Sequence, residues 1–159
     1  MTNPFHLAIP VSDLDKAAAF YENVIGCKRG REAKHWIDFD LFGHQLVCHY
    51  VETPSSYHSN PVDGDDVPVP HFGVILNIDE FDVLAKRLIE ANQSFIIEPR
   101  IRFKGKSGEQ RTMFLKDPSN NAIEFKAFAK SIILNEGILG INTSPLFFEE
   151  KHLITNFTA

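Results

Sequence analysis

The chain has 159 residues and a net charge of −5, and 43% of its residues are hydrophobic. This length fits one ordinary domain or two small modules that share a core. The acidic balance gives no basic footprint for nucleic acid, and no stretch approaches the roughly 20 apolar residues of a membrane span. Because the N-terminus lacks the regions of a signal peptide, we expect a cytoplasmic protein.

The first third of the chain is predicted to form a β-α-β-β-β unit. Residues 5–11 alternate in hydrophobicity, as in a strand with one buried face, and place His6 opposite the apolar side chains. Ser12 or Asp13 can cap the helix that follows, and Gly26 is a plausible end for it. A tight turn is expected at Gly43-His44, between the second and third of three further strands, predicted at 28–33, 35–42 and 45–51.

Residues 52–70 contain four prolines together with small polar residues. This composition predicts a loop or linker, and we expect little or no strand there. The segment divides the chain near its middle.

The same order of elements then returns. A strand that carries His71 is expected at 70–77, Asp79 is a candidate helix cap, and further strands are expected at 95–101, 111–115 and 122–127. Residues 129–159 match neither unit. We therefore predict an α+β fold of two βαβββ modules related by a pseudo-twofold axis, with sheets side by side and a helix on each outer face. The predicted divisions are a first module at 1–51, a linker at 52–69, a second module at 70–128 and a C-terminal extension at 129–159.

Three residues point to a metal site. His6 and His71 lie 65 positions apart at matching places in the two units, so a pseudo-twofold axis would face them toward one shared cup. Glu124 lies in the middle of an otherwise largely apolar strand, where a carboxylate needs a partner. Two imidazoles and one carboxylate suit Fe(II), Mn(II), Zn(II) or Ni(II) and leave positions open for a substrate. The alternative is that the histidines are structural and that Glu124 pairs with Lys126 or Arg111 on the surface.

Other candidates carry weaker signals. His44 and His49 lie on or beside the last strand of the first unit and could reach the same cup, where His49 or Gln45 could act as a fourth ligand. Lys104 and Arg111 belong to a basic patch around the polar loop at 103–110. This patch is either a solvated loop or a lid that receives an anionic substrate group.

Three stretches resemble the vicinal oxygen chelate superfamily, which includes glyoxalase I, extradiol dioxygenases and the fosfomycin- and bleomycin-resistance proteins. They read HLAIPVSDLDKAAAFYENVIGC, PHFGVIL and MFLKDPSNNAIEFKAF, and the resemblance extends over residues 4–128. It implies paired modules that curl into a cup around a metal. By matching position, it implies that His6, His71 and Glu124 are the metal ligands.

The resemblance leaves three classes of function open. A dioxygenase-like enzyme would use Fe(II) or Mn(II) and His44 as acid–base group, although Phe114 stands where such enzymes carry a tyrosine. A glyoxalase I-like lyase would need a fourth ligand on the last strand of the first module, where Cys48 or His49 falls near the matching position. A metal-free binding protein would not need the three ligands.

From these alternatives we predict a metal-dependent enzyme that acts on a small substrate chelated through adjacent oxygens. We favour a dioxygenase-like activity over a lyase, with iron or manganese as metal and zinc or nickel possible. His44 or His49 is the predicted acid–base residue, and Lys104 and Arg111 are the predicted substrate-binding residues. A homodimer is expected, with residues 129–159 as an arm across its interface.

Overall fold

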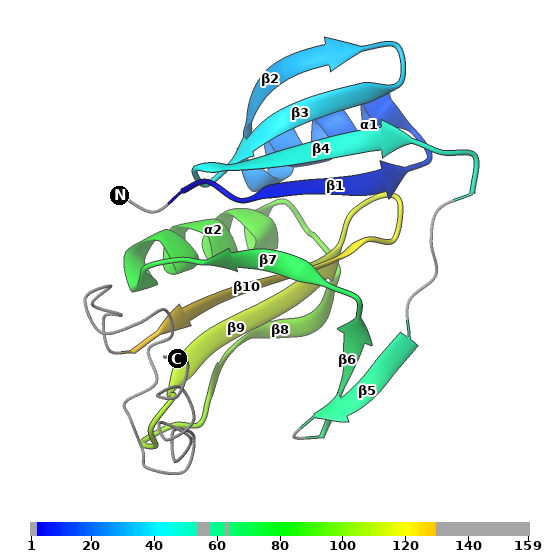
Figure 1. Ribbon diagram of the computed structural model, residues 1–159. Helices are drawn as coiled ribbons and strands as arrows, with labels where there is room; N and C mark the ends of the chain where they lie inside the picture. Colours follow the sequence, from blue (N-terminus) through cyan, green and yellow to red (C-terminus); the bar gives the residue numbers. More distant parts are fainter. Residues whose placement is uncertain (1–2, 54–57, 63, 130–159) are drawn as a thin grey trace, which may run out of the picture.

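A computed structural model describes residues 3–53, 58–62 and 64–129 of the chain. Figure 1 shows two separate sheets, the first coloured blue to cyan and the second green to yellow. Residues 130–159, which make up nearly all of the predicted C-terminal extension, lie outside the described residues. The dimer arm predicted there therefore stays a prediction. No helix within the described ranges is long and apolar enough to cross a membrane.

The first module has the predicted βαβββ order, and its sheet runs β1-β4-β3-β2. Asp13 caps the helix by accepting a hydrogen bond from the Lys16 backbone, and Gly26 ends it with a φ of 92°. The helix is less regular than expected, because its second half is π-helical. Its elements are β1 (His6–Val11), α1 (Leu14–Ala19), the π-helix η1 (Phe20–Ile25), β2 (Lys28–Ala33), β3 (Trp36–Leu41) and β4 (His44–Tyr50).

The second module repeats this topology, with strand order β7-β10-β9-β8. Asn77, not Asp79, caps its helix, because Asn77 and Glu80 each accept a hydrogen bond from the other's backbone. Asp79 lies in the first turn instead, where a carboxylate also favours the helix dipole. The elements are β7 (Phe72–Ile75), α2 (Ile78–Glu90), β8 (Phe95–Arg102), β9 (Gln110–Lys116) and β10 (Ala122–Phe128).

The segment between the modules corrects the prediction of a plain loop. It forms an antiparallel hairpin of β5 (His58–Val62) and β6 (Asp65–Val69). Prolines normally exclude a segment from a sheet because they lack an N–H. Here the sheet has only two strands, so each strand has an unpaired edge at which a proline interrupts no ladder bond.

The two modules are joined through their helices. α2 contacts η1, the Arg87 guanidinium donates to the Ile25 carbonyl at 3.2 Å, and the Tyr21 hydroxyl donates to Asp117 Oδ2 at 3.0 Å. The larger of two hydrophobic clusters among the described residues, which we call the core, draws on both helices and on the inner face of both sheets. The helices therefore meet each other across the junction and do not lie on separate outer faces, which differs from the sequence-based expectation. As a consequence, the opposite face of each sheet turns away from the shared core.

Candidate metal centre

The chemistry-bearing residues lie on the faces of the sheets that turn away from the core, which we call the polar faces. Strand alternation explains this placement. In β1, Ile9 and Val11 enter the core while His6 lies on the other side, exposed. In β10, Ile123 and Phe125 enter the core, so the intervening Glu124 lies on the polar face.

His71 and Glu124 come together on the second sheet. His71 precedes β7, and its Nε2 lies 3.4 Å from Glu124 Oε2. The Nδ1 of His71 is 2.6 Å from the backbone carbonyl oxygen of Pro68, which can only accept a hydrogen bond. Nδ1 therefore carries a proton, and Nε2 is the atom turned toward the carboxylate. The hydrogen bond to Glu124 raises the pKa of His71, so a metal at this nitrogen would compete with a proton.

Glu124 is a buried carboxylate, with 8% of its side chain exposed. Thr112 donates to Oε1 at 2.9 Å, and the Lys126 ammonium lies 2.8 Å from Oε2. Burial raises the pKa of Glu124, but the hydrogen bonds from His71, Lys126 and Thr112 outweigh it and hold that pKa below its ordinary value. The carboxylate is therefore ionised at neutral pH, and a cation already lies against Oε2.

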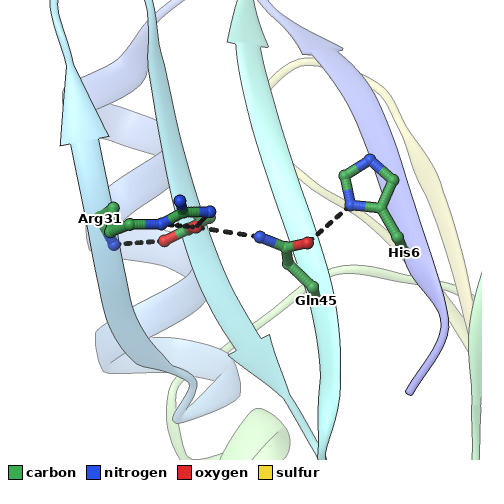
Figure 2. Close-up of polar contacts among 4 residues, drawn as sticks. His6, Arg31 and Gln45 are labelled. Atoms are coloured by element: carbon green, nitrogen blue, oxygen red, sulfur yellow. Dashed lines mark hydrogen bonds and ion pairs between the residues drawn. The ribbon is translucent and has the colours of Figure 1, made fainter. Parts of the chain in front are cut away.

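His6 has a similar arrangement on the first sheet. Its Nδ1 lies 2.7 Å from the side-chain oxygen of Gln45, the residue opposite it on β4 (Figure 2). The Gln45 amide in turn donates to Asp38 Oδ2 at 3.1 Å. Nε2 of His6 takes no part in this chain of bonds and points away from Gln45. Both histidines thus engage an oxygen through Nδ1.

Within one chain the three predicted ligands do not meet. No three His, Cys, Asp or Glu side chains among the described residues gather closely enough to hold a metal ion. A pocket of about 220 Å³ between the β1 and β7 edges is lined by His71 but not by His6. Two of the three predicted ligands, His71 and Glu124, therefore come together, whereas His6 lies on the polar face of the first sheet.

The donor atoms nevertheless fit a divalent metal. Metal-binding histidines usually hold the ring through one nitrogen and bind through the other, as both rings here are arranged to do. Glu124 keeps Oε2 for a cation because Thr112 occupies Oε1. Two imidazole nitrogens and one carboxylate oxygen form a set suited to first-row divalent metals.

The predicted acid–base histidines lie elsewhere. His44 Nδ1 accepts a hydrogen bond from the backbone of Phe5 at 3.0 Å, so its ring holds the segment before β1. Alternation along β4 places His44 with the core-facing Leu46, not with Gln45. His49 shares the polar face with Gln45, is exposed, and lies opposite Pro10 of β1.

The predicted substrate-binding cations are also apart from the site. Arg111 forms an ion pair with Asp82 of α2, on the helix-covered side of the second sheet. Lys104 is exposed in the loop between β8 and β9. Neither is in contact with Glu124 or His71, and their role in substrate binding stays a prediction.

Strand register shows which residue of the first module corresponds to Glu124. His6 lies opposite Gln45, and Val47 follows two residues later on the same face. Phe72 lies opposite Ile123, which places His71 level with Ala122 and Glu124 two residues later. The counterpart of Glu124 is thus Val47, which is 6% exposed. Neither Cys48 nor His49 occupies the position expected for a fourth ligand.

Sequence reasoning missed two residues that support the site. Thr112 contacts Glu124, and Asp38 contacts Gln45. Lys126, which also contacts Glu124, is one of the two cations that the sequence offered as its partner. Asp38 had a signal in the sequence, since an acid within the alternating apolar stretch WIDFDL needs a partner if it is buried. For Thr112 no spacing rule applied, because its contact depends on how β9 pairs with β10.

Comparison with known proteins identifies the family of the chain. A sequence model of the Glyoxalase/Bleomycin resistance protein/Dioxygenase superfamily matches residues 4–125. Over 120 residues the chain is 28% identical to the metallothiol transferase FosB of Lysinibacillus sphaericus, covering 76% of this chain and 78% of that protein.

Solved structures show the same fold. A glyoxalase/bleomycin resistance protein/dioxygenase from Alicyclobacillus acidocaldarius is 38% identical, with a TM-score of 0.65 over 81% of this chain and 93% of that one. The fosfomycin resistance protein FosX from Listeria monocytogenes superposes with a TM-score of 0.60 over 83% and 96% of the two chains. At 17% identity this second likeness concerns the fold alone.

Proposed function

Since the chain belongs to the Glyoxalase/Bleomycin resistance protein/Dioxygenase superfamily, that is, the vicinal oxygen chelate superfamily, we propose that it is a divalent-metal-dependent enzyme for a small, oxygen-rich substrate. His6, His71 and Glu124 are the proposed ligands. The observation that carries the proposal is the pairing of His71 Nε2 with Glu124 Oε2 at 3.4 Å, each held by a second contact on its other atom. Bound there, the metal would polarise two neighbouring substrate oxygens and stabilise the negative charge that develops on them.

The site is proposed to form between two copies of the chain. The helices join the modules so that both polar faces turn away from the common core, and His6 is exposed on β1, at an edge of its sheet. His6 at this exposed edge can meet the polar face of the second sheet in another copy. Twofold symmetry would then complete the set of three ligands at both sites. Each metal would then take His6 from one chain and His71 with Glu124 from the other.

The residues around Glu124 have separable roles in this proposal. Thr112 keeps the carboxylate oriented and ionised. Lys126 would leave Oε2 when the metal arrives, and its ammonium would then be available to an anionic substrate beside the metal. Phe114, opposite Glu124 on β9 and packed edge-on against the His71 ring, would keep water from that side of the site.

Among reactions, we propose addition of a thiol to a metal-chelated anion that carries a strained ring such as an epoxide: the S–C bond forms, the ring C–O bond breaks, and the thiol proton passes to the oxygen that is released. The four-ligand set of a glyoxalase-like lyase is disfavoured because Val47 stands at the position that corresponds to Glu124. The name of the FosB relative, a metallothiol transferase, fits a three-ligand metal site and a thiol nucleophile. The dioxygenase-like activity stays a prediction, and its acid–base groups lack support, because His44 holds the Phe5 backbone and Phe114 carries no hydroxyl.

The first experiment measures Mn²⁺ and Zn²⁺ binding by calorimetry to the wild type, Glu124→Gln and the surface control Glu98→Gln. We expect binding near one metal per chain in the wild type and the control, and none in Glu124→Gln. Wild-type protein that takes up neither metal would overturn the proposal. Fosfomycin with L-cysteine, and catechol with O₂, then serve as probe substrates, and turnover of catechol alone would favour the dioxygenase.

Subunit sharing has its own test. His6→Ala and Glu124→Gln chains are each expected to bind no metal as homodimers. When the two are unfolded together and refolded in equal amounts, half of the dimers are mixed, and each mixed dimer has one intact site if the ligands come from both chains. We then expect about a quarter of the wild-type metal capacity. No recovery in a mixture that contains mixed dimers would show that each site draws on one chain.

A further inference from the structure

Asp38 is a buried acid on the polar face of the first sheet, a face on which His6 and His49 are exposed. It is 5% exposed and lies in β3 between two core-facing residues, Ile37 and Phe39. Burying a carboxylate costs free energy unless it is paired and hydrogen-bonded. A charge held at such a cost on the face that carries a proposed metal ligand calls for an explanation.

The partners of Asp38 are arranged to keep it charged. Arg31 donates to Asp38 Oδ2 from Nε at 3.1 Å and from Nη2 at 3.0 Å, and its backbone N–H donates to Oδ1. Gly30 of β2 leaves room for the Asp38 carboxylate, because a Cβ at that position would meet Asp38 Oδ1. Burial raises the pKa of Asp38, but the hydrogen bonds from Gln45 and Arg31 outweigh it, so the carboxylate accepts hydrogen bonds and donates none.

This charge fixes the orientation of the Gln45 amide. Figure 2 shows the chain of contacts from Arg31 through the intervening carboxylate to Gln45 and His6. Because an ionised carboxylate only accepts, the Gln45 NH₂ group must face Asp38, at 3.1 Å. The amide oxygen is then forced toward His6 Nδ1, at 2.7 Å.

We propose that Asp38, acting through Gln45, is a positioning residue that selects the neutral tautomer of His6. The Gln45 oxygen only accepts, so the proton of the ring resides on Nδ1 and the lone pair on Nε2. Nε2 thereby becomes the nitrogen available to a metal. The part of this inference that concerns the metal rests on the proposed function, whereas the tautomer of His6 is a property of the metal-free chain.

The second module explains why the first needs this device. His71 Nδ1 meets the backbone carbonyl of Pro68, whose oxygen cannot exchange places with a donor. His6 meets a side-chain amide, which can rotate by half a turn and present NH₂ instead of oxygen. A fixed negative charge on the far side of the amide removes that freedom. The two modules thus place a proton on Nδ1 of their histidines by different routes.

Asp38→Asn tests the inference directly. An asparagine presents a donor on one side, so it no longer forces the Gln45 NH₂ group to face it. We expect the metal-free wild type, at a pH of about 8.5 where imidazoles are neutral, to show His6 protonated at Nδ1 in ¹⁵N-detected NMR. Asp38→Asn should move a substantial share of His6 to the Nε2-protonated tautomer and weaken Mn²⁺ binding by about 10- to 100-fold.

Two further variants separate positioning from folding. Asp40→Asn removes an equal charge from the same face of β3 and should leave the His6 tautomer unchanged. Combining Asp38→Asn with Gln45→Glu places a carboxylate that accepts from both neighbours, so the Nδ1-protonated state should return and Mn²⁺ affinity should recover. The His71 signal, which depends on Pro68, reports in every variant that the second module remains folded.

The outcomes are distinct. A wild-type His6 protonated at Nε2, or an unchanged tautomer in a folded Asp38→Asn, would overturn the inference whatever the metal result. A tautomer change without rescue by the double variant would also overturn it, because it would point to general damage. If the tautomers behave as expected but the wild type binds no metal, the proposed function fails and the selection of the His6 tautomer stands.

Discussion

Thr112→Val removes one hydrogen bond from a buried carboxylate while keeping the shape of the side chain. Thr112 is fully buried, and its hydroxyl donates to Glu124 Oε1 at 2.9 Å. Valine is also β-branched and suits a strand equally well. The loss is therefore a charge-assisted hydrogen bond, for which about 1.5–3 kcal/mol of unfolding free energy is expected. For a chain of this size, that lowers Tm by roughly 3–12 °C.

The pH dependence of this loss identifies its origin. Interactions that lower the folded-state pKa of Glu124 stabilise the fold above the unfolded-state pKa of about 4.3, and this stability is lost as pH falls through the lowered folded-state pKa. Without the Thr112 hydroxyl the folded-state pKa of Glu124 rises. The difference between wild type and variant should thus be constant above about pH 6 and shrink toward zero in acid.

Urea denaturation of the metal-free protein between pH 7 and pH 3 measures this difference. Thr112→Ser is the matched control, because it keeps the hydroxyl and loses only a methyl group. Its cost, about 1 kcal/mol, should not change with pH. The reasoning is refuted if Thr112→Val costs the same at pH 7 as in acid, since the loss would then come from packing and not from the carboxylate.

Three other changes give measurable effects. Gly73→Ala should destabilise the second sheet by about 1–3 kcal/mol, because a Cβ there would meet the backbone of Glu124, and calorimetric Tm with Mn²⁺ binding would check it. Tyr21→Phe should lower the unfolding free energy by about 1.5–3 kcal/mol by removing the donor to buried Asp117, and an unchanged urea midpoint would contradict this. Burial raises the pKa of Cys27 to about 12 and the second cysteine is also buried, so a thiol reagent should label the native protein slowly and the urea-unfolded protein fast; equal rates would contradict it.

The sequence predicted much of the fold because its signals were local. Alternation in residues 5–11, the caps and glycines at helix ends, and the repeated order of elements depend on neighbours along the chain. The hairpin of β5 and β6 was missed because proline content indicates a loop. The prolines are tolerated because β5 pairs only with β6, which leaves each strand an unpaired edge.

The candidate site divides in the same way. The sequence by itself determined the three proposed ligands and their matching positions, because a histidine or a carboxylate on an apolar strand is visible in the alternation pattern. Only the tertiary structure decided that His71 meets Glu124 while His6 turns away, since this depends on how the helices join the modules. Strand register, which no short stretch encodes, placed Val47 at the position that corresponds to Glu124 and brought Thr112 and Asp38 to their partners. Residue type and alternation are local properties of the chain, whereas the contacts that fix ionisation and orientation arise between strands distant in sequence.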